Sequence, residues 1–222
     1  MRRLDTWRFA GVAAALLGAA LGPSATSAAA QAGAAAGEPA AVAGAPTGVA
    51  GDPSPHSEIA LVSEVAAIRP GEPFHVALHV TLDPGWHTYW INAGDAGLPL
   101  TMAWRLPDGF TAGPVQWPVP EYIPVPPLAS YGYKGQVLLP VRITPPADLP
   151  EGGTVRLAGR AEFLVCEEIC LPASGEVELS VPVTDAAGGA AAPDPNWGAL
   201  VADTRARLPR PADAWTARAW TV

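Results

Sequence analysis

The sequence predicts an all-β fold, an immunoglobulin-like antiparallel β-sandwich that occupies residues 56–185 of the 222. Two observations lead to this prediction. Across residues 58–183, hydrophobic side chains alternate with polar ones, which is typical of strands with one buried face. The alternating segments are separated by turn-forming triplets such as residues 69–71 (Arg-Pro-Gly) and 83–85 (Asp-Pro-Gly). Because alternation alone does not determine topology, a closed β-barrel is the alternative.

Eight short strands account for the alternation. The four clearest cover residues 74–82, 137–143, 155–165 and 177–183, and the four weaker ones cover residues 59–66, 86–91, 100–106 and 113–117. Five prolines within residues 118–127 interrupt the pattern, because a proline lacks the N–H that a strand ladder needs. We therefore expect residues 119–130 to form a long, stiffened loop, which is either functional or a spacer at the edge of the sandwich.

The two ends of the chain lack this pattern. Residues 1–30 are interpreted as a signal peptide, because a basic start precedes a short apolar run and a small-residue cleavage site; an uncleaved membrane anchor is the alternative. Residues 31–55, rich in Ala, Gly and Pro, are expected to form a disordered tether. Residues 186–222 are expected to contain a linker, a tail and a short amphipathic helix with an apolar stripe of Trp197, Leu200, Val201 and Leu208.

Charge and residue counts exclude several functional classes. With 13 Lys and Arg against 21 Asp and Glu, the chain has a formal charge of -8, which argues against nucleic-acid binding. Two cysteines are too few for a four-cysteine zinc site or a multi-disulfide scaffold. The sequence carries no Ser-His-Asp elbow, phosphate loop or metalloprotease helix, and we expect no cofactor and no metal site.

The histidines are interpreted as structural residues. His75 and His79 share the outward face of one predicted strand but lie about 13 Å apart, too far to share a metal ion, and both are expected to be solvated. His87 lies between Trp86 and Tyr89, where packing in the core is favoured over catalysis. The aromatic residues of this region are likewise assigned to the core.

The most informative segment is Cys166-Glu167-Glu168-Ile169-Cys170. An extended strand would hold the two cysteine Cα atoms about 13 Å apart, whereas a disulfide tolerates about 7 Å, so a bond between them requires a three-residue hairpin loop. Closing so short a loop stabilises a fold by only about 2 kcal/mol. Two interpretations stay open: a structural staple of an exported domain, or an exchangeable redox pair in which one cysteine attacks and the other resolves.

Two carboxylates lie between the cysteines. Glu167 and Glu168 would disfavour a neighbouring thiolate, raise the pKa of the thiol and make the reduced pair a better electron donor. Cys170 is the expected nucleophile, because it precedes a Leu-Pro turn, whereas Cys166 adjoins Glu167 and the end of a strand.

Five motifs occur in order along residues 56–185. They are GWHTYW at 85–90, WRLPDGF at 104–110, QWPVP at 116–120, YGYKG at 131–135 and the cysteine segment at 166–172. Together they resemble the N-terminal periplasmic domain of the thiol:disulfide interchange protein DsbD, and more closely its relatives of the copper-sensitivity-suppressor type.

The resemblance implies a periplasmic thiol:disulfide oxidoreductase of the protein-disulfide reductase type, with Cys166 and Cys170 as its catalytic pair. Electrons would come from a membrane-embedded donor protein and pass to periplasmic thioredoxin-fold partners, either disulfide isomerases or proteins of cytochrome c maturation. The membrane would be met only through a partner. In the family an aromatic loop caps the cysteine pair, and here residues 119–130 with Tyr122, together with Tyr131, are the candidates.

Two departures from the family pattern matter. The three-residue spacing of the cysteines is that of the copper-related branch, which implies a role in copper tolerance. The best-known members have a longer spacing, so the choice of partner does not transfer from them. The membrane and thioredoxin domains of the family lie outside these 222 residues, so we expect either a fragment or a module that meets its donor in trans. The alternative function is a non-catalytic exported binding or scaffold module, chaperone-like or copper-handling, with a structural disulfide.

Overall fold

The computed structural model describes residues 54–184 and 191–210. The predicted signal peptide, nearly all of the predicted tether and the tail beyond residue 210 lie outside the described residues. The elements are β1 (Ser57–Ser63), β2 (Phe74–Leu82), β3 (His87–Gly94), β4 (Thr101–Arg105), β5 (Thr111–Val115), β6 (Glu121–Val125), β7 (Leu128–Lys134), β8 (Gln136–Thr144), β9 (Thr154–Cys166), β10 (Cys170–Pro182) and α1 (Gly198–Ala206).

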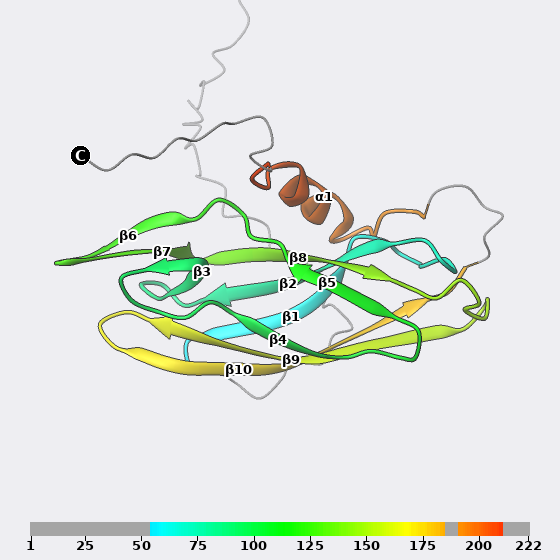
Figure 1. The fold of residues 1–222 in the computed structure, drawn as a ribbon, viewed down its shortest axis with the longest axis horizontal. Helices are drawn as coiled ribbons and strands as arrows, with labels where there is room; N and C mark the ends of the chain where they lie inside the picture. Colours follow the sequence, from blue (N-terminus) through cyan, green and yellow to red (C-terminus); the bar gives the residue numbers. More distant parts are fainter. Residues whose placement is uncertain (1–53, 185–190, 211–222) are drawn as a thin grey trace, which may run out of the picture. The chain divides into compact units, whose positions relative to one another are not determined.

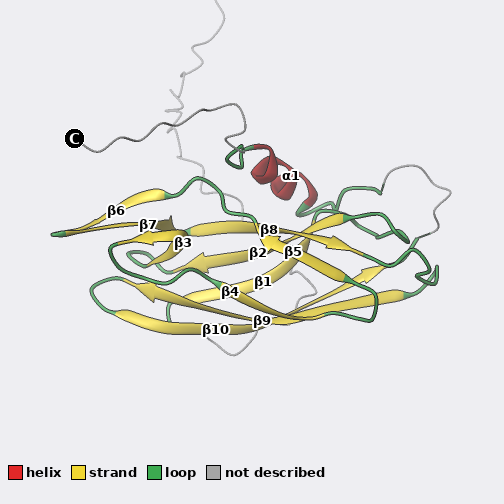
Figure 2. Ribbon diagram, in the orientation of Figure 1, coloured by secondary structure: helices red, strands yellow, loops and turns green. Residues whose placement is uncertain are grey.

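The strands form two antiparallel sheets (Figures 1 and 2). One sheet has four strands in the order β1-β2-β8-β5. The other has six, in the order β10-β9-β3-β7-β6, with β4 paired to β9 beside β3. The predicted immunoglobulin-like sandwich is confirmed. The barrel alternative is wrong, because the described strands separate into two sheets rather than one closed one.

The core lies between the sheets and is built from every second residue of the strands. In β2, Val76, Leu78 and Val80 are fully buried, and their partners come from strands of both sheets. Burying a side chain of this size stabilises a fold by about 1.5–3 kcal/mol, so the alternation in the sequence is the physical source of the strands. The aromatic residues assigned to the core are buried or packed against it: Trp86, Tyr89, Trp90, Trp104 and Trp117.

Residues 119–130 do not form the predicted loop. They contain β6 and the start of β7, which pair as a hairpin whose turn includes a cis Pro126–Pro127 peptide bond. β6 lies at the edge of its sheet, so Pro124 needs no N–H on the side that has no neighbouring strand. The prolines therefore restrict this segment to the edge of a sheet but do not prevent it from forming strands. The described residues contain ten strands, whereas eight were predicted.

The helix α1 covers part of the outer face of the four-stranded sheet. Val201 is fully buried against Val62 and Ala77, and Trp197 packs on the same cluster. Leu200, predicted to share this apolar stripe, is 49 % exposed. The short helix lies where the sequence predicted it. Its contact with the sheet comes from Trp197 and Val201 of the predicted stripe.

The outward face of β2 was predicted to be solvated, but part of it is covered. His75 Nδ1 lies 3.3 Å from a carboxylate oxygen of Glu64, and the His75 side chain is only 13 % exposed. His79 forms a hydrogen bond of 3.0 Å with Gln136, and its ring centroid lies 4.8 Å from that of Trp197. Both histidines face a surface that α1 and its preceding turn cover, and the polarity of a strand face does not reveal such a cover.

Candidate functional site

The two cysteines form a disulfide at the tip of the β9–β10 hairpin. Cys166 ends β9 and Cys170 begins β10, and the two residues are paired across the strands with Cα atoms 4.2 Å apart. The chain reverses over the three residues between them, as predicted. The second strand begins at Cys170, earlier than the predicted start at residue 177, because β10 is an edge strand that accommodates Pro172.

The two sulfur-bearing residues differ in exposure. Cys166 is 2 % exposed and packs in a small cluster with Tyr89, Ala93 and Leu164. Cys170 is exposed, as are all three residues of the loop. A thiol–disulfide exchange begins with a thiolate attacking one sulfur of the disulfide, and access decides which sulfur is attacked. Of the two cysteines, Cys170 is therefore the one that the fold leaves accessible.

The side chain of Tyr89, on β3, contacts the sulfur of Cys170. Its Oη lies 3.4 Å from Cys170 Sγ. Burial raises the pKa of Tyr89, so the phenol stays protonated and can donate a hydrogen bond to a sulfur that carries negative charge. Gly97, with φ of +101°, lies against the ring: a Cβ there would be 2.3 Å from the nearest ring atom.

Sequence reasoning missed the role of Tyr89. It assigned the residue to the core, which is correct for its burial and incomplete for its hydroxyl group. The sequence signal that could have indicated this role is the position of Tyr89 within the GWHTYW motif, on a strand that precedes a turn-rich loop. Only the pairing of β3 with the end of β9 shows that this strand starts beside the cysteines.

His87 lies beside Cys166, on the neighbouring strand β3. It is paired across the sheet with Cys166 on one side and with Lys134 on the other. Burial lowers the pKa of His87, and the charge of Lys134 lowers it further. The ring is neutral near pH 7 and sits edge-on to Tyr89, with centroids 5.3 Å apart. His87 packs as predicted, although its Nε2 is buried with no hydrogen-bond partner among the described residues.

Neither loop carboxylate forms an ion pair within the described part of the chain. Glu167 and Glu168 are exposed. The Glu167 side chain lies against Gly85, where a Cβ would be 2.4 Å from Glu167 Oε1, and Gly85 has φ of +92°. The turn that precedes β3 is therefore shaped by glycine to receive the Cys loop.

Tyr122 and Tyr131 lie on the β6–β7 hairpin, one strand away from Tyr89. They are paired across the hairpin, and their ring centroids are 5.9 Å apart. Both side chains are exposed. Because Tyr89 is paired with Gly132 of β7, the hairpin flanks the strand that contacts the disulfide. The hydrogen-bond contact to sulfur comes from Tyr89, not from these two residues.

Two further observations concern other kinds of site. Within residues 54–184 and 191–210, no group of three or more His, Cys, Asp or Glu side chains is placed to hold a metal ion. The one helix of the described chain is too short and too polar to cross a membrane.

Comparison with known proteins identifies the family. Residues 58–182 match the family model of the N-terminal part of the thiol:disulfide interchange protein DsbD. Among solved structures, the N-terminal periplasmic domain of ScsB from Proteus mirabilis is similar, with 18% identity and a TM-score of 0.48. The match covers 70% of this chain and 55% of that one, so the chain spans about half the length of this relative. No curated protein sequence matches the chain. Since the family model spans more than half of the 222 residues, the chain belongs to the family of DsbD N-terminal domains.

Proposed function

We propose that this domain is a periplasmic thiol:disulfide relay whose catalytic pair is Cys166 and Cys170. The observation that carries the proposal is the asymmetry of the disulfide: Cys170 is an exposed residue whose sulfur lies beside a hydroxyl group, whereas Cys166 is buried. A structural staple has no need of an exposed cysteine. Membership of a thiol:disulfide interchange family supports the same chemistry.

The reaction runs as two exchanges. In the first, a thiolate of a reduced donor attacks Cys170 Sγ, which forms a mixed disulfide and releases the Cys166 thiolate, which takes up a proton. The second donor thiol then attacks the donor sulfur of the mixed disulfide, and the Cys170 thiolate that leaves also becomes protonated. The donor is left oxidised, and the domain holds two thiols. Two electrons and two protons have moved to the cysteine pair.

The second exchange reverses these roles. The Cys170 thiolate attacks the disulfide of an acceptor, and the Cys166 thiolate displaces the acceptor to restore the Cys166–Cys170 bond. Tyr89 donates a hydrogen bond to the sulfur of Cys170 when it is charged. Glu167 and Glu168 oppose that charge, which disfavours the reduced state and promotes transfer of electrons to the acceptor. The protein is then a protein-disulfide reductase, fed by a membrane-embedded donor and delivering to thioredoxin-fold proteins.

The surface around the disulfide supports a protein partner. Of the large hydrophobic side chains that are exposed in the described residues, all but Leu200 lie on the Cys loop, on the β3–β4 segment or on the β6–β7 hairpin and its approach. Ile169, between the cysteines, is 64 % exposed. Apolar side chains gathered around a reactive bond favour docking of another protein surface rather than of a small polar thiol. The flanking members are Ile91, Leu98, Val119, Tyr122, Leu128 and Tyr131.

The proposal is tested first by the redox potential of the full chain, with circular dichroism recorded across the titration. We expect a potential within the range of thioredoxin-fold proteins, roughly -120 to -270 mV, and an unchanged fold on reduction. A potential below about -300 mV, or unfolding on reduction, would identify the disulfide as structural and would favour the exported binding or scaffold module.

A trapping experiment assigns the roles of the two cysteines. Cys166→Ala leaves the exposed Cys170 to attack an oxidised thioredoxin-fold protein, with no second thiol to resolve the product, so a covalent adduct should accumulate on a non-reducing gel. Cys170→Ala is the matched control and should trap little, because Cys166 is buried. Equal trapping by both variants would contradict the assigned nucleophile, and no trapping by either would contradict the relay.

A further inference from the structure

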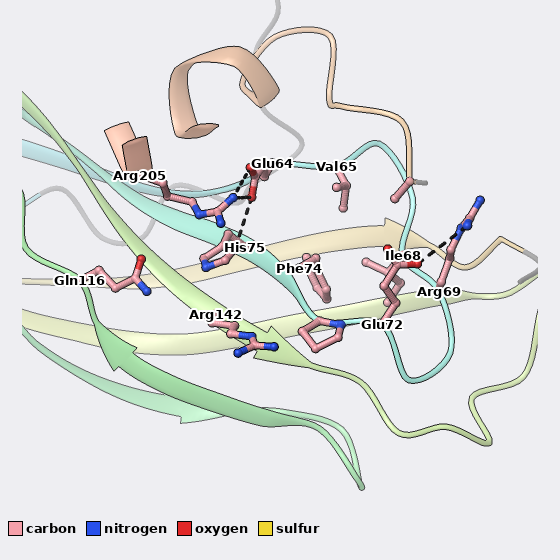
Figure 3. A pocket seen from close by; sticks show the side chains of 12 residues that line it. Glu64, Val65, Ile68, Arg69, Glu72, Phe74, His75, Gln116, Arg142 and Arg205 are labelled. Atoms are coloured by element: carbon pink, nitrogen blue, oxygen red, sulfur yellow. Dashed lines mark hydrogen bonds and ion pairs between the residues drawn. The ribbon is translucent and has the colours of Figure 1, made fainter. Parts of the chain in front are cut away.

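A second site lies at the opposite end of the sandwich from the disulfide. A cavity of about 550 Å³ opens beside the start of β2, between the β1–β2 turn, β8 and α1 (Figure 3). Phe74 and His75, at the start of β2, line the cavity, whereas the loop between the cysteines adjoins the turn that follows Leu82 at the other end of the same strand. Seven residue steps along the strand separate His75 from Leu82, or roughly 23 Å.

The lining of this cavity is charged and contains an uncommitted cation. Arg142 of β8 is paired across the strands with His75, so both side chains lie on the outward face of the sheet. Arg142 is exposed, and no carboxylate of the described residues is ion-paired with it. Arg205 of α1 reaches the same cavity from above in Figure 3.

The carboxylates of the cavity are already engaged. Glu64 accepts two hydrogen bonds from Arg205 Nη1, at 2.5 and 2.8 Å, and lies 3.3 Å from His75 Nδ1. Glu72 lies 3.8 Å from Arg69. With three arginines against two glutamates in the lining, the cavity keeps an excess of positive charge in a chain whose formal charge is -8.

Two buried polar atoms in the lining have no partner within the described residues. They are Gln116 Oε1 and Arg69 Nε. A buried polar atom without a hydrogen bond is costly. The Arg69 Nε–H lacks an acceptor, which an anionic ligand would supply, whereas Gln116 Oε1 is itself an acceptor and lacks a donor, such as the hydroxyl of a protonated phosphate. Gln116 lies on the Arg142 side of the cavity and also lines an adjoining hollow beneath α1, together with His75 and Arg205.

The electrostatics at His75 agree with an excess of positive charge. Burial lowers the pKa of His75, and Arg205 and Arg142 lower it further, while Glu64 raises it. These are the charged groups that face His75 from β1 and its turn, from β8 and from α1. An anion placed between the two arginines would oppose their effect and raise the pKa of the imidazole.

We propose that this cavity binds a small anionic molecule through a carboxylate or phosphate group, with Arg142 as the main cationic contact and the Nε2–H of Gln116 as a neutral donor. An arginine guanidinium holds either group through paired hydrogen bonds, and the cavity volume is in the range used for small ligands. The site is separate from the cysteine pair, and its existence does not depend on the redox function. It adds a binding function to a domain otherwise described by its disulfide.

The test follows the His75 ring resonances by NMR in the full chain with its disulfide intact. Inorganic phosphate and succinate are titrated separately up to about 10 mM, against sodium chloride of matched ionic strength. We expect a saturable shift of the His75 signals and a higher His75 pKa with at least one of the two probes. Binding of phosphate alone or of succinate alone assigns the ligand group.

Three variants make the result specific to the cavity. Arg142→Gln should weaken binding at least about tenfold, since it removes a charge-assisted hydrogen-bonding pair from an exposed position. Arg142→Lys keeps the charge and should retain part of the affinity. Arg156→Gln is the matched control on the other sheet and should bind like the parent chain. The proposal is overturned if neither probe shifts His75 beyond the chloride control, or if Arg142→Gln, folded by circular dichroism, binds unchanged.

Discussion

The two ends of the sandwich present opposite kinds of surface. At the disulfide end, the Cys166–Cys170 bond lies at a hairpin tip, the loop residue Ile169 is exposed, and further exposed apolar side chains lie on β3 and on the β6–β7 hairpin of the same sheet. At the other end, charged side chains line a cavity that is partly closed by α1. A protruding apolar surface fits a protein partner, whereas a charged hollow fits a small ion-bearing molecule. The two proposed functions, docking of a protein partner and binding of a small anion, therefore lie at the two ends of one scaffold, separated by the length of a strand.

The largest expected effect comes from disturbing the strand that supports the disulfide end. A Cβ at Gly132 of β7 would lie 1.9 Å from the carbonyl oxygen of Thr88. Gly132→Ala would therefore push β7 and its hairpin away from β3, and we expect a loss of about 3 kcal/mol in the free energy of unfolding, measured with urea. Gly153→Ala is the control, because a Cβ there meets nothing within 4 Å; a similar loss in both variants would contradict the tight β3–β7 contact.

A second substitution asks whether the helix-covered end is independent of the disulfide. Val201→Ala removes buried contacts with Val62 and Ala77 and should lower the free energy of unfolding by about 2 kcal/mol, while leaving the redox potential unchanged. Leu200→Ala, on the exposed side of the same helix, should change stability by less than about 0.5 kcal/mol. A shift in potential in the Val201 variant would show that the two ends are coupled.

A third change is confined to one hydroxyl group at the disulfide end. Tyr89→Phe removes the hydrogen bond that stabilises charge on Cys170, so the pKa of that thiol should rise and its alkylation at pH 7 should slow about fivefold, an effect of about 1 kcal/mol. Tyr133→Phe loses a comparable buried bond, from its Oη to Pro118 O at 2.8 Å, and should leave the alkylation rate unchanged. Equal rates in the Tyr89 variant and the parent would remove the tyrosine from the mechanism.

The smallest expected effect is a pH dependence that both ends share. The pKa values of His75 and His87 are lowered in the fold from an ordinary value of 6.5. The unfolded chain therefore binds more protons than the folded chain in this range, so the free energy of unfolding falls as the pH decreases below about 6.5. The decline ends below the folded pKa values.

Urea titrations between pH 7.5 and pH 5 would measure this slope. His75→Gln should flatten the part that belongs to the cavity, and His87→Gln the part that belongs to the disulfide end. If stability instead rises as the pH is lowered, the two histidines are charged in the fold and the assigned direction is wrong. Adding phosphate should diminish only the His75 contribution.

Much of the architecture could be predicted from the sequence, because burial leaves a period of two in the strands. The alternation around Val76, Leu78 and Val80 predicted β2 and its buried face, and the spacing of the cysteines predicted the hairpin. The failure at residues 119–130 has a physical cause. Prolines exclude a central strand but allow an edge strand, and position within a sheet is a tertiary property.

The candidate site was predictable in its sulfur atoms and not in its surroundings. Cysteine is a rare residue with distinctive chemistry, so Cys166 and Cys170 stand out in the sequence. Tyr89 comes from a strand 81 positions away from Cys170, and its residue type is common in any core. The solvation of His75 was predicted wrongly for a similar reason, since the polarity of a strand face does not reveal that a distant helix will cover it.

The ladder between β9 and β10 has a kinetic consequence. The two strands stay paired along thirteen residue positions each, up to and including the cysteines, so the ladder keeps Cys166 next to Cys170 even when no bond joins their sulfurs. In the proposed relay we therefore expect the resolving thiol to act at a high effective concentration and a mixed disulfide at Cys170 to be short-lived. Partners can then be released by chemistry rather than by weak affinity, which permits a docking surface as apolar as the one around Ile169.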